Sequence, residues 1–462
     1  MSISTSGFKA HPSTSSLASL ASASRSPSGP RNPTGLRSAS TPTATKFSDT
    51  ASIAGTSIAG VMTSSSRQKS RSKSPGSTTM RDRERDKERD GDKEKDGKDG
   101  KEGKSGQGSK GSRGLATQPR LRNTPHLPSG KDVEPVPATL MYWSRAPVYG
   151  LLPTHGMRAH SITLVDNIAW IFGGCDEKGC WRDVWCFSVE SMQWSNPDTV
   201  GDIPPPCRAH TATLVDRRIV VFGGGEGPVY YSNLYVLDTI TRRWQHPTFP
   251  EGTDLPPPRR AHTSVLYRGR IYIFGGGNGT QALNDLWTLE VGTNANVEKM
   301  RWEEQQTRGR KPSPRGYHTA NLIGNVMIVM GGSDGRECFS DMWCLNLDNL
   351  NWSQVRLATS YRRLSHTATQ VGSYLFICGG HDGSSYTSEM LLFNLVSLTF
   401  ETRSPAGRSP SARGYHAALQ ADSRLFIFGG FNGNEVFDDV HLLDLAGAAY
   451  LPQVTSFRIE VD

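Results

Sequence analysis

The chain has 462 residues, a net charge of +8 and 35% hydrophobic residues, so it can build a folded core. It contains no apolar run of about 18 residues, so we expect no membrane insertion. Residues 1–19 lack a continuous apolar stretch, so we expect no secretory signal and a cytoplasmic protein, with the cell cortex or the nucleus as alternatives.

Residues 1–130 are rich in Ser, Thr, Gly, Pro and charged residues, and they carry the excess of positive charge. We predict a disordered Ser/Thr-rich and mixed-charge tail, because this composition cannot bury enough apolar area to offset chain entropy. Ser26, Thr41 and Ser74 each precede a proline near a basic residue. They are phosphorylation candidates, so kinases and phospho-readers are expected partners of the tail.

Residues 81–104 alternate in charge and hold ten basic and ten acidic side chains, which is typical of a solvated linker. Association with RNA is the alternative interpretation of this tail. The segment is net neutral and has no aromatic residue to stack on bases, so nucleic acid is not an expected partner.

Residues 131–138 are predicted to be a linker, and a strand signal follows at Leu140, Met141, Tyr142 and Trp143. Trp143 precedes the first repeated histidine by 17 residues, a spacing like that between a late aromatic residue and the next histidine further along. We therefore expect residues 139–144 to close a ring by pairing with residues 440–445. We expect the chain from Tyr450 onward to contribute little.

One unit repeats six times after residue 159. In each unit a histidine opens a strand, and thirteen residues later a second strand ends in Gly-Gly. The histidines are His160, His210, His262, His318, His366 and His416. The first glycines of the pairs are Gly173, Gly223, Gly275, Gly331, Gly379 and Gly429. A fixed spacing inside the unit and a variable one between units indicate a repeat architecture with variable loops.

Each unit continues with a third strand and a late bulky aromatic residue, at Trp194, Trp244, Trp302, Trp352, Phe400 and Tyr450. The pattern resembles the kelch repeat, which implies a β-propeller. Runs such as residues 219–222 and 271–274 are apolar on both faces, as expected for strands stacked between neighbouring sheets. We predict an all-β, six-bladed kelch propeller over residues 139–450, with residues 451–462 as a C-terminal extension.

An arginine lies two or three residues before each histidine, at Arg158, Arg208, Arg260, Arg315, Arg363 and Arg413. A second polar series follows each Gly-Gly, at Asp183, Asn233, Asp285, Asp341, Glu389 and Asp439. Because these groups recur in every unit, we interpret them as scaffold, and we expect the second series to bond turn amides. The basic residues Arg308, Arg310, Lys311 and Arg315 predict a separate basic patch.

The cysteines are expected to be reduced and mostly buried thiols. Cys180 and Cys338 share one repeat position, and they belong to units on opposite sides of the predicted ring. A zinc site built from Cys175, Cys180 and Cys186 matches no common ligand spacing. We therefore expect no metal and no cofactor.

The loops after Gly-Gly differ from unit to unit and carry aromatic residues and arginines, which anchor protein interfaces. The candidate partner-binding residues are Trp181, Arg182, Tyr230, Tyr231, Arg336, His381, Tyr386, Phe431 and Asn432. The resemblance implies a protein-interaction platform, and the layout is similar to fungal cell-end and Ras-pathway kelch proteins. We expect a non-catalytic scaffold or adaptor in signalling, cell polarity or cytoskeletal organisation.

A metal-dependent propeller enzyme of the kelch oxidase or specifier type is the alternative function. Glu435 and Asp439 match the first step of the specifier spacing, but Leu443 takes the next position. The sequence also offers no nucleophile–base pair, so we expect no catalytic residues.

Overall fold

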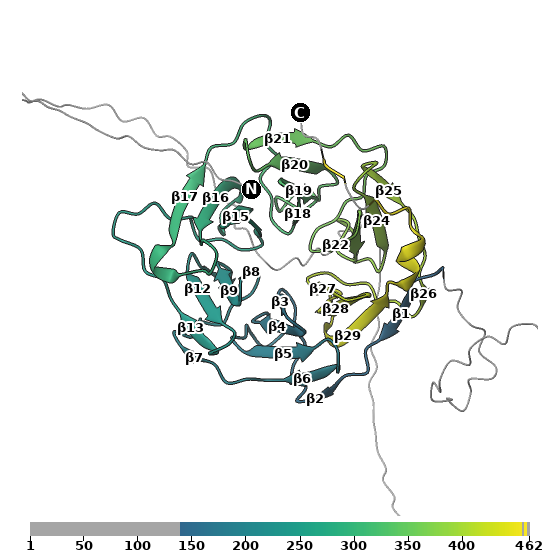
Figure 1. Ribbon diagram of the computed structural model, residues 1–462, viewed down its shortest axis with the longest axis horizontal. Helices are drawn as coiled ribbons and strands as arrows, with labels where there is room; N and C mark the ends of the chain where they lie inside the picture. The colour runs from purple at the N-terminus through teal and green to yellow at the C-terminus, as the bar shows by residue number, and fades with distance from the viewer. Residues whose placement is uncertain (1–138, 455–456, 460–462) are drawn as a thin grey trace, which may run out of the picture. The chain divides into compact units, whose positions relative to one another are not determined.

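The computed structural model describes residues 139–454 and 457–459. These residues form a ring of six antiparallel sheets around a central channel (Figure 1), which confirms the predicted six-bladed propeller. The predicted tail and linker, including Ser26, Thr41 and Ser74, lie outside the described residues. No helix within the described ranges has the length and apolar character needed to cross a bilayer.

In five blades the four main strands follow one another along the chain from the channel outward, with a short hairpin inserted in blade 2. Blade 1 contains β3 (Ser161–Val165), β4 (Ile168–Phe172), β5 (Val184–Ser188) and β6 (Gln193–Ser195). Blade 2 contains β8 (Thr211–Val215), β9 (Arg218–Phe222), β12 (Leu234–Asp238) and β13 (Arg243–Gln245). Blade 3 contains β14 (Thr263–Tyr267), β15 (Arg270–Gly277), β16 (Ala282–Glu290) and β17 (Arg301–Gln305). Blade 4 contains β18 (Thr319–Ile323), β19 (Val326–Met330), β20 (Met342–Asn346) and β21 (Asn351–Gln354). Blade 5 contains β22 (Thr367–Val371), β23 (Tyr374–Cys378), β24 (Met390–Asn394) and β25 (Thr399–Glu401).

Blade 6 combines both ends of the described chain. Its strands are β27 (Ala417–Ala421), β28 (Arg424–Phe431), β29 (Val436–Asp444) and, outermost of the four, β1 (Tyr142–Arg145). Short parallel strands extend three blades outward: β2 (Tyr149–Gly150), β7 (Val200–Gly201) and β26 (Ala406–Gly407). The remaining elements are the hairpin β10 (Gly225–Glu226) and β11 (Val229–Tyr230), and the 3-10 helices η1 (Val297–Lys299) and η2 (Ala446–Tyr450).

The second strand of each blade is apolar on both faces because each face packs against a different neighbour. In β19 all five residues are buried. Val326, Ile328 and Met330 pack with blade 5, whereas Met327 and Val329 pack with blade 3. The late aromatic residues fill the outer part of the same interfaces. Trp302 packs against Phe222 of the preceding blade with ring centroids 4.8 Å apart.

Two rings of backbone hydrogen bonds join the blades near the channel. In the first, the N–H of the residue before each histidine donates to the carbonyl of its counterpart in the preceding blade, at 2.8 to 2.9 Å. This ring runs through Ala159, Ala209, Ala261, Tyr317, Ser365 and Tyr415, and all six have φ between 52° and 59°. In the second, the second glycine of each Gly-Gly pair donates to the next blade at 2.7 to 2.9 Å.

The second ring explains the Gly-Gly pairs. Gly173 has a φ of +66°, and a Cβ there would lie 2.4 Å from the carbonyl oxygen of Cys207 in the next blade. A side chain would thus create a steric clash and also strain the backbone. Glycine is therefore needed at this position for the approach of the neighbouring blade.

The N-terminal strand closes the ring, as predicted. β1 pairs antiparallel with β29, with Trp143 opposite Leu443 and Arg145 opposite His441. Trp143 is 4% exposed and packs between blades 5 and 6, whereas Tyr450 lies in η2 and is 63% exposed. Trp143 therefore occupies the outer aromatic position of blade 6.

The segment after Tyr450 contributes more than expected. Leu451 is buried in the cluster that contains Trp143, and Ile459 is buried between blades 4 and 5. Gln453 accepts a hydrogen bond from the Ser373 backbone N–H at 2.9 Å. The expectation that this segment adds little is wrong, because its apolar residues cover the ends of these blades.

Replacing Trp143 with alanine should lower the free energy of unfolding of the full-length protein by about 3–5 kcal/mol, because it leaves a cavity between blade 5 and the strand that closes blade 6. Chemical denaturation of the variant measures this loss. Tyr450→Ala is the matched control and should unfold within about 0.5 kcal/mol of the parent, because its side chain is exposed. Equal stability of the two variants would show that β1 does not close the ring.

Candidate functional site: the loop face and the channel mouth

The antiparallel order of the strands places two sets of loops on one face of the ring. The loops after Gly-Gly and the connections from each outer strand to the next inner strand lie on this side, which we call the loop face. The loops after Gly-Gly span residues 175–182, 225–232, 277–284, 333–340, 381–388 and 431–438. Tight turns lie on the opposite face, and Gln453 binds one of them at Ser373. A binding surface that differs between blades is therefore expected on the loop face.

A shared turn holds five of the six loops. In blade 1, the Asp176 carboxylate accepts hydrogen bonds from the backbone N–H groups of Lys178 and Gly179, at 2.7 and 3.1 Å. The same turn recurs at Asn278, Asp334, Asp382 and Asn432. Such Asx turns fix the backbone locally. These five loops thus share one ordered backbone turn and differ in the side chains at their tips.

The candidate residues of the first two blades differ in exposure. Arg182 is exposed, and the half-buried Trp181 stacks on His155 with ring centroids 4.0 Å apart. Tyr230 lies under the guanidinium of Arg260, 4.1 Å from it. Tyr231 packs at the edge of the core between blades 1 and 2. In these two blades Trp181 and Arg182 are the side chains best placed for a partner.

The other candidates form a cross-blade group, apart from the exposed Arg336. His381 is buried, and its ring meets that of Tyr386 edge-on at 4.8 Å. Tyr386 in turn packs edge-on against Phe431, with centroids 5.9 Å apart. The Asn432 side chain caps its own turn. Tyr386 and Phe431 are half-buried, so they order the loops of blades 5 and 6 and also present surface.

The repeated arginines fall into two classes, which the sequence interpretation merged. Arginines three residues before a histidine are buried and pair with the acidic series of their own blade. Arg315 donates to Asp341 at 2.6 and 3.0 Å and to the Gly331 carbonyl at 2.9 Å. Equivalent pairs are Arg259–Asp285, Arg363–Glu389 and Arg413–Asp439. The acidic residues of these blades therefore bind arginine, and the expectation that they bond turn amides is wrong.

The buried pairs have two further consequences. Burial alone would raise the pKa of Asp341, but the hydrogen bonds and charge of Arg315 outweigh burial and lower it. Trp343 Nε1 also donates to the Asp341 carboxylate, at 2.7 Å. Arg315 is fully buried, so it is not part of the predicted basic patch.

Arginines two residues before a histidine instead contact the preceding blade. The Arg158 guanidinium stacks on Phe431 at 4.2 Å, and Arg208 Nη1 donates to Cys175 Sγ at 3.7 Å. Arg158, Cys175, Arg208, Tyr317 and Tyr415 line a small cavity here, which we call the channel mouth. Sequence reasoning missed this group because it treated every arginine as scaffold. The residue directly before the histidine differs between units, and this variation could have revealed Tyr317 and Tyr415 as members of the group.

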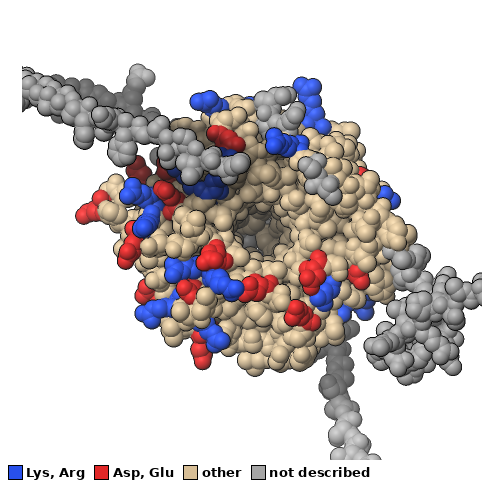
Figure 2. Space-filling view, in the orientation of Figure 1, with Lys and Arg blue, Asp and Glu red and all other residues tan. Residues whose placement is uncertain are grey.

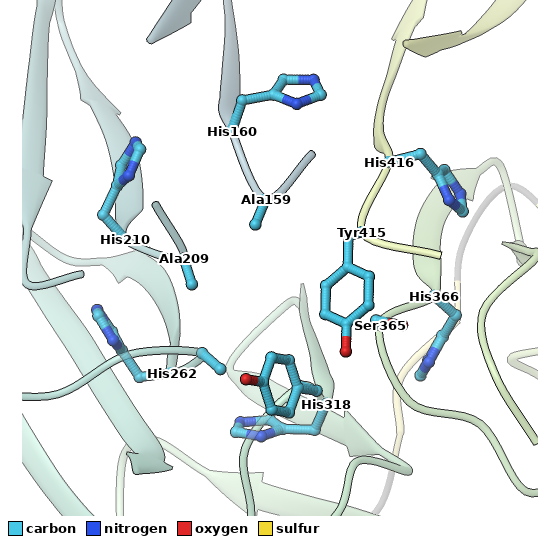
Figure 3. Close-up of a pocket in the computed structure, with 12 residues that line it drawn as sticks. Ala159, His160, Ala209, His210, His262, His318, Ser365, His366, Tyr415 and His416 are labelled. Atoms are coloured by element: carbon cyan, nitrogen blue, oxygen red, sulfur yellow. The ribbon is translucent and has the colours of Figure 1, made fainter. Parts of the chain in front are cut away.

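The six repeat histidines lie in the wall of the channel, and Tyr415 projects toward its centre (Figure 3). Five of them form a hydrogen bond between Nε2 and a Ser or Thr hydroxyl of the preceding blade, at 2.8 to 3.0 Å. Burial lowers their pKa values, to about 3 for His210, His366 and His416 and about 4 for His160. The ring is neutral at physiological pH and has a structural role.

The histidine ring is interrupted at His160. Its expected partner in blade 6 is Ala417, which occupies the position of Ser161, Thr211, Thr263, Thr319 and Thr367 in the other blades. Neither ring nitrogen of His160 has a hydrogen-bond partner, although both are buried. The interface where the ring closes therefore lacks one inter-blade hydrogen bond.

The cysteines and carboxylates form no metal cluster in the part of the chain that the structure describes. All seven cysteines are free, and Cys175, Cys186, Cys207, Cys344 and Cys378 are buried. Cys186 lies in β5, whereas Cys175 and Cys180 lie in the loop.

Four-stranded blades, the histidine and Gly-Gly positions and the interlocking aromatic residues define a kelch-type β-propeller. Residues 159–362 and 295–452 match the model of the KLHDC2/KLHL20/DRC7 Kelch-repeats domain. These matches together cover more than half of the chain, so the protein belongs to this kelch-repeat family.

Curated relatives share only parts of their length with this chain. Rat host cell factor 1 is 34% identical over 125 residues, covering 23% of this chain and 6% of that protein. The Rho GTPase-activating protein gacHH of Dictyostelium discoideum is 32% identical over 108 residues, covering 22% and 7%. Acyl-CoA-binding domain-containing protein 4 of Arabidopsis thaliana is 27% identical over 215 residues, covering 46% and 23%. The chain thus spans a small fraction of each of these proteins.

Replacing Ala417 with serine should raise the free energy of unfolding by about 0.5–1.5 kcal/mol, because it supplies the hydroxyl that His160 lacks. Denaturant unfolding of the full-length variant measures the gain. Ser161→Ala, which removes the partner of His210, should cost about as much. A loss of stability in Ala417→Ser would show that the closing interface has no room for this bond.

Acid should destabilise the propeller before its carboxylates protonate. Unfolded histidines bind protons below about pH 6.5, whereas native His160, His210, His366 and His416 stay neutral until the pH approaches 3–4. Burial also lowers the pKa values of His262 and His318. The unfolded state therefore binds more protons, and stability falls as the pH drops through this window. The loss should be roughly 2 kcal/mol at pH 5 for each of the four histidines with a native pKa of about 3–4.

Denaturant unfolding at pH 7 and pH 5 measures this effect. His318→Gln should reduce the difference between the two pH values, whereas His246→Asn, at an exposed histidine, should leave it unchanged. Equal stability of the parent at both pH values would contradict the prediction.

Proposed function

We propose that this protein is a non-catalytic interaction scaffold or adaptor that binds protein partners through the loop face of its propeller. Kelch propellers are typically protein-interaction domains. The observation that carries the proposal is the construction of the loops. One ordered turn frame recurs in five blades while the side chains at the tips differ.

An ordered loop loses little conformational entropy on binding, so more of the contact energy becomes affinity. Figure 2 shows one face of the ring, on which charged side chains of both signs surround the central hollow. Recognition on the loop face would depend on individual anchors. Trp181, Arg182 and Arg336 are of the residue types and exposure that anchor interfaces.

Within this proposal, the biological setting is signalling, cell polarity or cytoskeletal organisation, in the cytoplasm or at the cell cortex. The layout is similar to fungal cell-end and Ras-pathway kelch proteins. One relative named above is a Rho GTPase-activating protein, which agrees with a signalling context. Phosphorylation of Ser26, Thr41 or Ser74 would add a second set of partners through the tail.

The alternative of a metal-dependent enzyme finds less support. Asp439 of the specifier-like pair accepts hydrogen bonds from Arg413 and contacts His441 Nε2 at 3.0 Å. Its carboxylate is thus already hydrogen-bonded within blade 6. Glu435 is an exposed residue of a turn. We therefore propose no catalytic role for either residue.

The triple variant Trp181→Ala, Arg182→Ala and Arg336→Ala should reduce recovery of the propeller's partners at least about tenfold, because interface anchors each contribute more than about 1 kcal/mol. Quantitative affinity capture with the full-length protein measures recovery. Its melting temperature should stay within a few degrees, because Arg182 and Arg336 are exposed and Trp181 is a half-buried loop residue outside the hydrophobic clusters of the blades.

The matched control alters exposed residues in a turn of the opposite face, Ile240→Ala with Arg242→Ala. This variant should recover the same partners as the parent. If the control loses them and the triple variant does not, the partner binds the opposite face.

A further inference from the structure

We propose that Cys175 and Cys180 form an oxidisable dithiol at the channel mouth, which peroxide converts into an intrachain disulfide. The two cysteines face each other across the hairpin of the blade 1 loop. The pairing geometry, the charges around Cys175, its access to the channel and the contrast with the equivalent position of blade 4 support this assignment.

The backbone places the two side chains at disulfide distance. The N–H of Asp176 donates to the Gly179 carbonyl at 3.1 Å, and the N–H of Trp181 donates to the Gly174 carbonyl at 2.9 Å. These bonds flank the cysteines, which therefore form a non-hydrogen-bonded antiparallel pair. Such pairs have Cα atoms about 4.5 Å apart, within the range of about 4.4–6.8 Å that disulfides require.

The surroundings make Cys175 the nucleophile and Cys180 the resolving thiol. Arg208 Nη1 lies 3.7 Å from Cys175 Sγ, and Arg158 pairs with Cys175 through its backbone. A hydrogen bond from the Cys180 thiol and the charges of Arg208 and Arg158 outweigh burial and lower the pKa of Cys175 to about 6. The pKa of Cys180 is raised by the same hydrogen bond, by burial and by the nearby Cys175 and Glu226.

Cys175 is buried, but its place in the wall of the channel-mouth cavity gives a small oxidant a route to its sulfur. Cys175 lines the cavity of the channel mouth together with Arg158, Arg208, Tyr317 and Tyr415. Cys180 is half-exposed on the loop. Cys186, Cys207, Cys344 and Cys378 are buried, and burial raises each of their pKa values to about 12, so they should react much more slowly.

The reaction balances with hydrogen peroxide as the oxidant. The Cys175 thiolate attacks one peroxide oxygen, the O–O bond breaks, and hydroxide leaves to give the sulfenic acid. The Cys180 sulfur then attacks the Cys175 sulfur, the S–O bond breaks, and water leaves with the thiol proton. Two electrons pass from the two sulfurs to peroxide. The disulfide removes the thiolate charge beside Arg208 and Arg158, which makes the mouth more positive.

Blade 4 provides a matched comparison within the same molecule. Cys338 occupies the position of Cys180 and faces Ser333 across an equivalent hairpin. The positions of Arg158 and Arg208 are taken there by Gly316 and Leu364. Ser333→Cys would therefore create a second dithiol with the same backbone geometry and without counterparts of Arg158 and Arg208. The charges of Arg362 and Arg363 act there on Cys338, the other thiol of the pair.

The experiment treats the full-length protein with hydrogen peroxide at pH 7 and maps tryptic peptides without reduction. Trypsin cleaves after Lys178, between the two cysteines, so a disulfide appears as two peptides joined by a reducible bond. We expect this species to form first and to revert with dithiothreitol. In Cys180→Ser, dimedone should label Cys175 as the sulfenic acid.

In the Ser333→Cys variant, the native pair should oxidise about tenfold faster than the pair in blade 4, because its thiolate is more populated at pH 7 although each thiolate is less nucleophilic. Oxidation of Cys175 should also accelerate with a midpoint near pH 6. Equal rates for the two pairs, or earlier oxidation of any other cysteine, would overturn the proposal.

Discussion

The closed ring of backbone hydrogen bonds through Ala159, Ala209, Ala261, Tyr317, Ser365 and Tyr415 is the constraint on which this propeller depends. Each N–H donates to the preceding blade, so every blade is fixed against both neighbours before any side chain is considered. The bonds require left-handed backbone at six non-glycine residues, which is unfavourable in isolation. Tight packing between the blades must therefore compensate for this strain, and the buried second strands and interlocking aromatic residues provide that packing.

The interface between blades 6 and 1 is where this constraint is least supported. Blade 1 has Met157 where blades 3 to 6 have a buried arginine, and blade 6 has Ala417 where the other blades have a hydroxyl. The pairing of β1 with β29 compensates, because it ties the two ends of the described propeller through four residue pairs. A buried apolar cluster also joins blades 6 and 1, in which Phe187 packs against Phe428. Closure therefore depends on sheet pairing and burial more than on the polar bonds that join the other blades.

The repeat spacing was sufficient to predict the fold and the closing role of Trp143, because both follow from strand periodicity and from pairs of positions that recur six times. The arginines show where that reasoning fails. Arg260 and Arg315 differ by one position relative to the following histidine, and in extended backbone one residue reverses the direction of the side chain. Arg315 therefore points toward Asp341 of its own blade, whereas Arg260 points toward the preceding blade and packs on Tyr230. Because both residues are arginines, the sequence interpretation assigned them to one series and missed this difference.

A comparison of equivalent positions in the six blades also separates structural residues from variable residues within each loop. The position two residues after the first glycine is Cys175 in blade 1 and Gly225, Gly277, Ser333, His381 and Phe431 in the others. Backbone bridges place this position beside the residue two before the histidine in its own blade. In blades 6 and 1 its side chain also meets the equivalent arginine of the next blade, at Arg158 and Arg208. This position differs from blade to blade, whereas the ring of backbone hydrogen bonds is the same in all six blades. The arginine-flanked thiol pair of blade 1 therefore lies outside the hydrogen bonds that close the propeller.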